Sequence, residues 1–241
     1  MDPPTFIKTI NVTKDTATLV WNFCSDKNYC HIYKAICSCI AIKTEGSGYE
    51  IENSKVSFNI SKDYQDDLKN FTIVMKNMSP YTYYECDAKT IGKDGESKWS
   101  NKVAILTAED KPSSPIYFRY AGSIGHGERL FKWQPPLYLP GKLISYSLNF
   151  TWEPLYKVPT YCSNHNQDFY SDIDPIVNDF LYTSEETYAE YKAEIRTNTN
   201  AGWSEKSVVL FYNTSIGSKD NKLITVFLNL TMHIILFINN I

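Results

Sequence analysis

An internal repeat of aromatic residues most constrains what this 241-residue chain can fold into. Three landmarks of the first half recur in the second half after 112, 113 and 107 residues, respectively: Trp21 as Trp133, Tyr33 as Tyr146 and Tyr84 as Tyr191. A glycine follows the last tyrosine of each copy by eleven residues (Gly95 and Gly202), and a Trp-Ser pair comes after it (Trp99-Ser100 and Trp203-Ser204). Because the landmarks keep their order and approximate spacing, the sequence predicts two domains of about 100 residues each.

A charged, proline-rich segment, AEDKPSSP, separates the two copies and is typical of a short linker. The predicted organisation is a first domain over 1–108, a linker over 109–115 and a second domain over 116–214. A polar spacer and an apolar tail follow over 215–241.

Hydrophobic residues alternate with polar ones in several short segments, which is the pattern of half-buried strands. Tyr84, Cys86 and Ala88 alternate with polar residues, and the same period occurs in 17–23, 56–60, 71–75 and 146–152. In the last of these, the pattern places Asn149 on the outward face, where a glycan has room. No segment of a dozen residues before the tail has a helical period of 3.6, so the sequence predicts an all-β fold of sandwiches.

The segment Met78-Ser79-Pro80-Tyr81-Thr82-Tyr83-Tyr84 resembles the Leu-x-Pro-x-Thr-x-Tyr turn of fibronectin type III domains. The second copy ends correctly at Tyr191 but lacks the Pro and the Thr. The chain thus resembles tandem fibronectin type III domains over about residues 3–213. The resemblance implies two immunoglobulin-like β-sandwiches in series, in which Tyr84 and Tyr191 return their hydroxyls to the backbone. It also implies a structural core that includes Trp21, Tyr33, Tyr84, Trp133, Tyr146 and Tyr191.

Five of the six cysteines lie in the first copy, and Cys162 lies alone in the second. In the fibronectin type III arrangement the third and sixth strands share a sheet, so the resemblance implies that Cys37 or Cys39 meets Cys86. Cys24 and Cys30 flank a five-residue loop that a disulfide between them would close. One cysteine of the first copy then remains for Cys162 or for another chain. Cysteine-rich versions of the domain occur in some receptor ectodomains, including those of receptor-type tyrosine phosphatases.

The even number of cysteines favours the oxidising secretory route, as do seven Asn-x-Ser/Thr triplets. The candidate glycosylation sites are Asn11, Asn59, Asn70, Asn77, Asn149 and Asn213, with a seventh triplet at Asn229 in the tail. The alternative is a cytosolic protein with free thiols. We expect an extracellular or cell-surface protein, and because Met1 is followed by no leader-like segment, we expect the chain to be part of a longer one.

The apolar segment 223–238 is 16 residues long and contains Asn229, Thr231 and His233. A bilayer span needs about 20 apolar residues. Three interpretations therefore stay open: a marginal membrane segment, a lipid-anchor signal after small residues at 215–218, and translated non-coding sequence.

Composition and motifs argue against several function classes. The formal net charge is −3, without the basic excess that binding to nucleic acid requires. No Gly-x-Ser-x-Gly, phosphate-binding glycine loop, His-Glu-x-x-His or Cys-x5-Arg occurs, so we expect neither an enzyme nor a cofactor. The cysteine spacing and the acidic pairs at 172–174 and 185–186 match no metal site. We interpret Gly125–Arg129 as a solvated turn.

We therefore expect a non-catalytic extracellular protein-binding or adhesion segment of a cell-surface receptor. Its partner would be an extracellular or cell-surface protein, and the cysteine-rich first copy leans toward a receptor-type tyrosine phosphatase ectodomain. One alternative is a secreted or membrane-anchored decoy of these two domains. Another is a cytokine-receptor module, because Trp203-Ser204-Glu205-Lys206-Ser207 resembles the Trp-Ser-x-Trp-Ser box of those receptors, with Lys206 in place of the second Trp.

Overall fold

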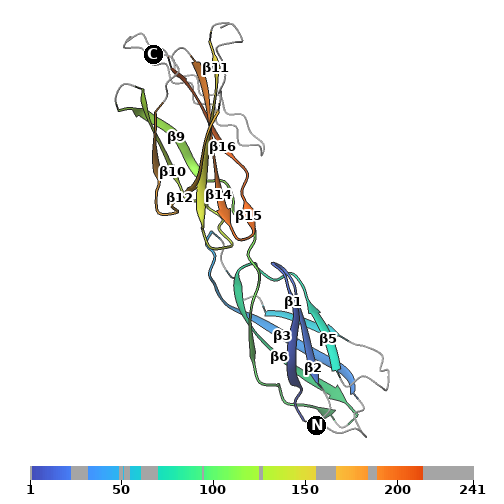
Figure 1. The fold of residues 1–241 in the computed structure, drawn as a ribbon. Helices are drawn as coiled ribbons and strands as arrows, with labels where there is room; N and C mark the ends of the chain where they lie inside the picture. Colours follow the sequence, from blue (N-terminus) through green and yellow to red (C-terminus); the bar gives the residue numbers. More distant parts are fainter. Residues whose placement is uncertain are drawn as a thin grey trace, which may run out of the picture. The chain divides into compact units, whose positions relative to one another are not determined.

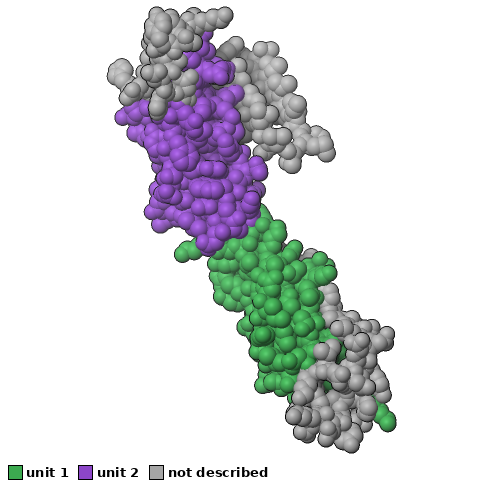
Figure 2. Space-filling view, turned by 45° about the vertical axis from the view of Figure 1, so that its right-hand side comes forward, with its two compact units in different colours: residues 1–110, 138–142 green, residues 111–137, 143–241 purple. Residues whose placement is uncertain are grey.

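The computed structural model describes residues 2–22, 32–48, 51, 55–60, 70–93, 95–124, 127–155, 167–183 and 189–213, and gives only the backbone of residues 33, 55–60 and 213. Within these ranges the regular structure is entirely β, without a helix, so the predicted all-β class is confirmed. The chain divides into unit 1 (residues 1–110 and 138–142) and unit 2 (residues 111–137 and 143–241), coloured separately in Figure 2. The division after Asp110 falls inside the predicted linker.

Unit 1 contains two antiparallel sheets (Figure 1). The first has the order β1-β2-β5, formed by β1 (Thr5–Val12), β2 (Ala17–Asn22) and β5 (Asn70–Met75). The second has the order β4-β3-β6-β7, and a fifth strand, β8, also pairs with β6. Its strands are β3 (Ile32–Thr44), β4 (Lys55–Ile60), β6 (Thr82–Gly92), β7 (Gly95–Glu96) and β8 (Val103–Leu106).

Unit 2 repeats this arrangement strand for strand. Its three-stranded sheet has the order β13-β10-β9, formed by β9 (Ile116–Ser123), β10 (Glu128–Gln134) and β13 (Asp179–Thr183). Its second sheet has the order β12-β11-β14-β15, and β16 also pairs with β14. These strands are β11 (Ser145–Pro154), β12 (Gln167–Ile173), β14 (Ala189–Thr199), β15 (Gly202–Trp203) and β16 (Ser207–Asn213).

The core of each unit lies between its two sheets. In unit 1, Trp21 and Ile73 of the three-stranded sheet pack in one cluster with Cys37 and Tyr84 of the other sheet. Along β6 buried and half-buried residues alternate strictly, which is the period of two that its sequence predicted. Burying one large apolar side chain in this way stabilises the fold by roughly 1.5–3 kcal/mol.

Unit 2 has a core rich in aromatic rings. Phe150 on β11 stacks on Tyr182 of β13, with 3.9 Å between the ring centroids. Phe131 of β10 meets Phe150 edge-on at 5.1 Å. Each such pair adds about 0.5–1.5 kcal/mol beyond the area that it buries. These contacts join the two sheets of unit 2 across its interior.

The register of the strands defines which residues of the two copies are equivalent. From Tyr84 to Ser100 the first copy matches the second, from Tyr191 to Ser207, at a constant offset of 107 residues. Gly95 and Gly202 occupy the same hairpin position, with φ of 103° and 112°, a conformation that other residues rarely adopt. This conformational need explains why a glycine recurs at the same place.

Two predicted equivalences differ from this register. Ala35 lies opposite Thr90 as Tyr146 lies opposite Thr197, so Tyr146 matches Ala35 and not Tyr33. A register shift between Ile32 and Lys34 changes the residue count at the start of β3. Similarly, Glu96 pairs with Ile91 as Trp203 pairs with Asn198, so the residue that matches Trp203 is Glu96 and not Trp99.

Candidate functional site

The aromatic residues predicted for the core are buried. None of the five whose side chains are described is more than 3% exposed: Trp21, Tyr84, Trp133, Tyr146 and Tyr191. The side chain of Tyr33 lies outside the described residues. At this burial the five rings fill space between the sheets and present no surface to a ligand.

Tyr84 makes the contact expected of a tyrosine corner. Its ring is 1% exposed, and its hydroxyl oxygen accepts a hydrogen bond of 2.6 Å from the backbone N–H of Ser79. Tyr191 has the same burial, but the turn before β14 (residues 184–188) lies outside the described residues. The predicted return of the Tyr84 hydroxyl to the backbone is therefore present in unit 1.

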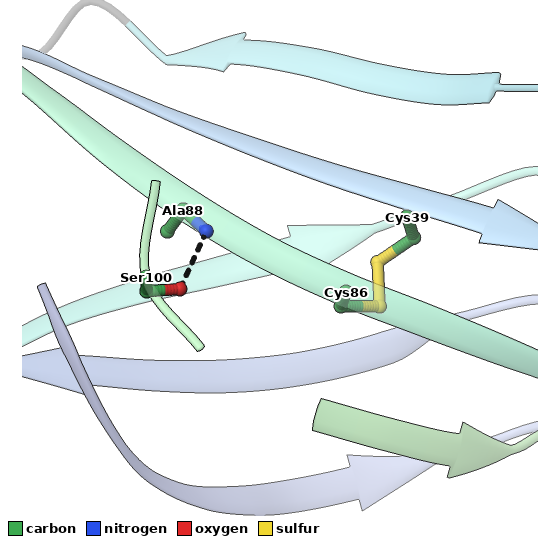
Figure 3. The surroundings of a disulfide bond; sticks show 4 residues. All are labelled: Cys39, Cys86, Ala88 and Ser100. Atoms are coloured by element: carbon green, nitrogen blue, oxygen red, sulfur yellow. Dashed lines mark hydrogen bonds between the residues drawn. A yellow bond between two sulfur atoms is a disulfide. The ribbon is translucent and has the colours of Figure 1, made fainter. Parts of the chain in front are cut away.

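A disulfide joins Cys39 of β3 to Cys86 of β6, with 4.1 Å between the Cα atoms (Figure 3). The two residues are direct cross-strand partners, and neither has any exposed surface. Of the two pairings that the resemblance left open, the structure has the one through Cys39. Cys37 lies opposite Ala88 instead and is a free, fully buried thiol.

The Cys37 thiol is chemically inert in this setting. Burial raises its pKa to about 12, and the nearby negative charge of Asp87 acts in the same direction. The reactive thiolate is therefore scarce at neutral pH. Cys24, Cys30 and Cys162 lie outside the described residues, so the pairing predicted for Cys24 with Cys30 stays a prediction.

The candidate glycosylation sites fall into two groups. Asn11 on β1, Asn70 at the start of β5 and Asn77 after that strand are exposed. Asn149 on β11 is half-buried and hydrogen-bonded. The side chains of Asn59 and Asn213 lie outside the described residues, as does the whole of Asn229.

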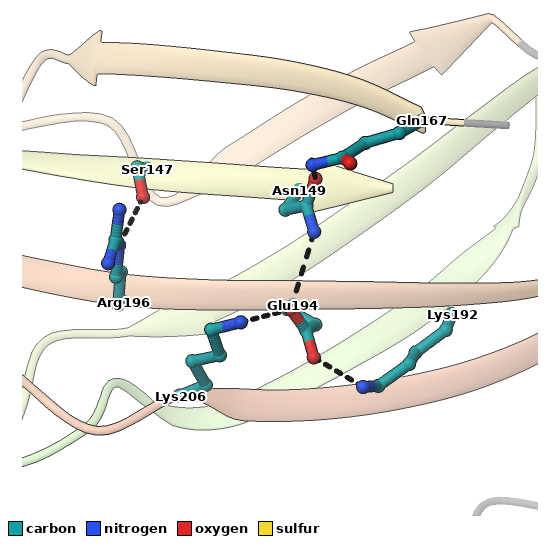
Figure 4. Close-up of polar contacts among 7 residues, drawn as sticks. All are labelled: Ser147, Asn149, Gln167, Lys192, Glu194, Arg196 and Lys206. Carbon is teal, nitrogen blue, oxygen red and sulfur yellow. Dashed lines mark hydrogen bonds and ion pairs between the residues drawn. The ribbon is translucent and has the colours of Figure 1, made fainter. Parts of the chain in front are cut away.

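The most organised polar cluster among the described residues lies on the outer face of the five-stranded sheet of unit 2 (Figure 4). At its centre, the side chain of Glu194 on β14 is only 7% exposed. It forms ion pairs with Lys192 at 2.5 Å and Lys206 at 2.6 Å. Asn149 of β11 also donates a hydrogen bond to it, at 3.3 Å. A buried carboxylate needs this set of partners to stay charged.

The electrostatics of Glu194 follow from two opposed effects. Burial alone would raise the pKa of its carboxyl group. The hydrogen bonds from Lys192, Lys206 and Asn149 together outweigh burial and lower the pKa to about 2. Glu194 is therefore ionised throughout the physiological range, and the network keeps a fixed geometry.

Arg196 lies two residues further along β14 on the same face. Its guanidinium lies over the ring of Trp203, with 4.4 Å from Cζ to the ring centroid. Its Nε donates a 3.0 Å hydrogen bond to Oγ of Ser147. These two contacts hold the planar group in place and leave its terminal nitrogens facing outward, since none of them has a hydrogen-bond partner among the described residues.

Unit 1 has a related arrangement at equivalent positions. Lys89, which matches Arg196, lies 5.3 Å from the ring centroid of Trp99 and forms a 2.6 Å ion pair with Glu96. The hydroxyl oxygen of Ser97 accepts a 3.0 Å hydrogen bond from the N–H of Thr90. Ser204 does the same for Thr197 in unit 2, also at 3.0 Å. Both hairpins therefore combine a cation over an indole ring with a serine that binds the neighbouring strand.

A groove of about 150 Å³ opens beside the Glu194 cluster. We call it the β11–β14 groove, and its lining includes Ser147, Asn149, Gln167, Phe169, Arg196 and Lys206. Phe169 on β12 lies directly opposite Asn149, and 54% of its surface is exposed. The groove therefore combines one apolar ring with several hydrogen-bond donors.

Sequence reasoning singled out only Asn149 and Lys206 of this cluster. The segment YKAEIRT does place Lys192, Glu194 and Arg196 at alternate, outward positions of one strand. That alternation is the available signal. Their partners come from β11, β12 and the segment before β16, and only the strand register brings these together.

Other predicted features have plain structural settings. Asp174 accepts a hydrogen bond from the N–H of Ile176 in a turn, and no group of three metal-binding side chains occurs in the part of the chain that the structure describes. Residues 125–126 lie outside that part, and Arg129 is buried at the start of β10. In the described ranges no helix is long and apolar enough to cross a bilayer, and the segment 223–238 lies beyond them.

Comparison with known proteins gives no family assignment. The chain matches no protein-family model, and no curated protein matches it.

Proposed function

We propose that the chain is a non-catalytic extracellular binding or adhesion segment of a cell-surface receptor, built of two fibronectin type III-like domains in series. The strand order carries this proposal. Both units combine a sheet of their first, second and fifth strands with a sheet in which the third and sixth strands are neighbours. The resemblance in the sequence requires this neighbourhood, and domains of this family are common in receptor ectodomains.

Two observations support an oxidising, secretory location. The Cys39–Cys86 disulfide is fully buried, and structural disulfides persist mainly outside the cytosol. Asn11, Asn70 and Asn77 lie at the surface in glycosylation triplets, where an attached glycan has room. Neither observation depends on the identity of the ligand.

The surface chemistry suits recognition of a protein. Arginine and aromatic residues are enriched where proteins bind each other. Unit 2 presents Arg196, Trp203 and Phe169 on its five-stranded sheet, in positions fixed by their neighbours. An extracellular or cell-surface protein is therefore the class of partner that we assign.

One observation favours a second candidate, a cytokine-receptor-like module. The Trp-Ser-x-Trp-Ser resemblance carries the expectation of aromatic rings stacked with arginines. One such contact, Arg196 over Trp203, is present, and Ser204 binds the neighbouring strand. Lys206 stands at the second Trp position and pairs with Glu194, which interrupts the stack.

The location can be tested with antibodies against this chain on cells of its source. We expect labelling of intact cells, and a faster mobility of the native protein on non-reducing gels than after reduction. Labelling confined to permeabilised cells, or a reactive Cys39 in the native protein, would contradict the proposal. Labelling of the culture medium alone would favour the secreted decoy.

Ligand binding needs a second experiment. The full chain, secreted with an added leader and clustered on beads, should bind intact cells saturably, and protease treatment of those cells should abolish the binding. Binding that survives protease treatment would argue against a protein partner.

A further inference from the structure

Asn149 differs from the other described glycosylation candidates because its side chain has defined partners. Its Oδ1 accepts a 2.7 Å hydrogen bond from Nε2 of Gln167, and its Nδ2 donates to Oε2 of Glu194 at 3.3 Å (Figure 4). Thr151 completes the triplet Asn149-Phe150-Thr151. The glycan attachment atom therefore lies at the floor of the β11–β14 groove.

The hydrogen bonds of Asn149 leave room for a glycan linkage. An amide nitrogen carries two hydrogens, and the hydrogen bond to Glu194 uses one of them. The other has no partner among the described residues. Attachment of a sugar replaces one hydrogen and keeps the amide planar, so both observed hydrogen bonds persist in the modified side chain.

The walls of the groove have the chemistry that binds a sugar ring. Phe169, directly across from Asn149, offers an exposed apolar ring against which the C–H face of a pyranose packs. Arg196, Gln167 and Lys206 supply N–H donors for hydroxyl and acetamide oxygens. The volume of about 150 Å³ is suited to one ring rather than to a length of polypeptide.

We propose that the β11–β14 groove holds the first N-acetylglucosamine of an N-glycan carried by Asn149. In the attachment step, a bond forms between sugar C1 and Nδ2, and the bond from C1 to the pyrophosphate of a lipid-linked oligosaccharide breaks. The lipid pyrophosphate leaves, and Nδ2 loses one proton. The inference shares with the proposed function the requirement that the chain enters the secretory pathway.

The consequence is that the occupant of this groove is part of the molecule itself. Glu194, held ionised by Lys192 and Lys206, fixes the amide from below, and Phe169 fixes the sugar from the side. A protein ligand would then bind a different surface of the chain or contact the outer sugars.

The test uses the full chain, secreted with an added leader from cells that make high-mannose glycans. Thr151→Ala prevents glycosylation but keeps Asn149, and Phe169→Ala removes the proposed ring contact. The two changes are made singly and together. Asn11→Gln is the matched control, because it removes an exposed site on another sheet.

We expect mass spectrometry to find Asn149 occupied and Thr151→Ala to lower Tm by about 3–6 °C. In the Phe169→Ala background the same change should lower Tm by less than half as much, because the sugar has lost its ring contact. Enzymatic trimming that leaves one N-acetylglucosamine should preserve Tm. Asn11→Gln should show no coupling to Phe169→Ala.

Three results would overturn the inference. If Asn149 is unoccupied while Asn11 or Asn70 carries glycan, the groove assignment fails and the secretory assignment stands. If Asn149 is occupied but Thr151→Ala has the same effect with and without Phe169, the sugar lies elsewhere. If none of the triplets is occupied, the inference and the proposed function lose their common support.

Discussion

The hydroxyl oxygen of Tyr84 accepts a 2.6 Å hydrogen bond from the backbone N–H of Ser79, five residues earlier in the chain. The bond ties the turn before β6 to the core of unit 1, because the ring of Tyr84 is buried between the sheets. A tyrosine at this position therefore has two structural functions, one for its ring and one for its hydroxyl.

Tyr84→Phe separates these two functions. The ring stays, but the Ser79 N–H loses its acceptor, so we expect the free energy of unfolding to fall by about 1–2 kcal/mol. Tyr146→Phe is the matched control, because the Tyr146 hydroxyl is buried with no hydrogen-bond partner among the described residues. Removing that group should change stability by less than about 0.5 kcal/mol. Urea unfolding of both variants measures the difference, and equal losses would contradict the assignment.

Loss of the Cys39–Cys86 disulfide should destabilise unit 1 strongly. The two residues are 47 positions apart, and closing a loop of that length corresponds to about 4 kcal/mol of chain entropy in the unfolded state. We expect the Cys39→Ala, Cys86→Ala double variant to lose an amount of this order in denaturant unfolding. Cys37→Ala is the control, since it removes a buried sulfur without opening a loop, and should cost about 1 kcal/mol. A larger loss in the control would indicate that Cys37 takes part in the bridge.

The charge network around Glu194 predicts a dependence of stability on pH. The folded-state pKa of about 2 lies below the ordinary value of 4.5, so the ionised carboxylate stabilises the folded state above pH 4.5. This contribution is lost as the pH falls from 4.5 to 2. The free energy of unfolding of unit 2 should drop across that window, and the drop should become smaller in Glu194→Gln. An unchanged pH profile in this variant would show that other carboxyl groups control acid unfolding.

Arg196 and Trp203 should be energetically coupled. Arg196→Lys keeps the charge but loses the planar group that stacks on the ring and the Nε–H that Ser147 accepts. In a double-mutant cycle with Trp203→Ala, we expect a coupling of about 0.5–1 kcal/mol. The pair Lys89 and Trp99, at a longer distance of 5.3 Å, is the internal comparison and should couple more weakly. Coupling of equal strength at both pairs would mean that the guanidinium plane is unimportant.

Local periodicity predicted the strands and their buried faces well. In YECDAKT the alternation identified Tyr84, Cys86 and Ala88 as one face, and these three residues are buried. Alternation cannot choose between Cys37 and Cys39, however, because both lie on the same face of β3 and are only two residues apart. The choice depends on the register between β3 and β6, which residue spacing along one strand does not contain.

The candidate site was largely beyond sequence reasoning for the same reason. Asn149, Gln167, Glu194 and Lys206 are far apart in the chain and meet only because β12, β11 and β14 lie side by side. Their residue types are common on protein surfaces, so none of them is conspicuous alone. The mismatch between Trp99 and Trp203 has a similar origin, since counting from a glycine does not reveal which residue faces which strand.

The constant offset of 107 residues from Tyr84 to Ser100 has an evolutionary consequence. A stretch free of insertions and deletions is the trace that tandem duplication of one ancestral segment leaves. Since that event the copies have kept a cation over an indole ring while exchanging the positions: Trp99 aligns with Lys206, and Glu96 aligns with Trp203. What was inherited at this hairpin is therefore a contact between two kinds of side chain rather than any particular residue.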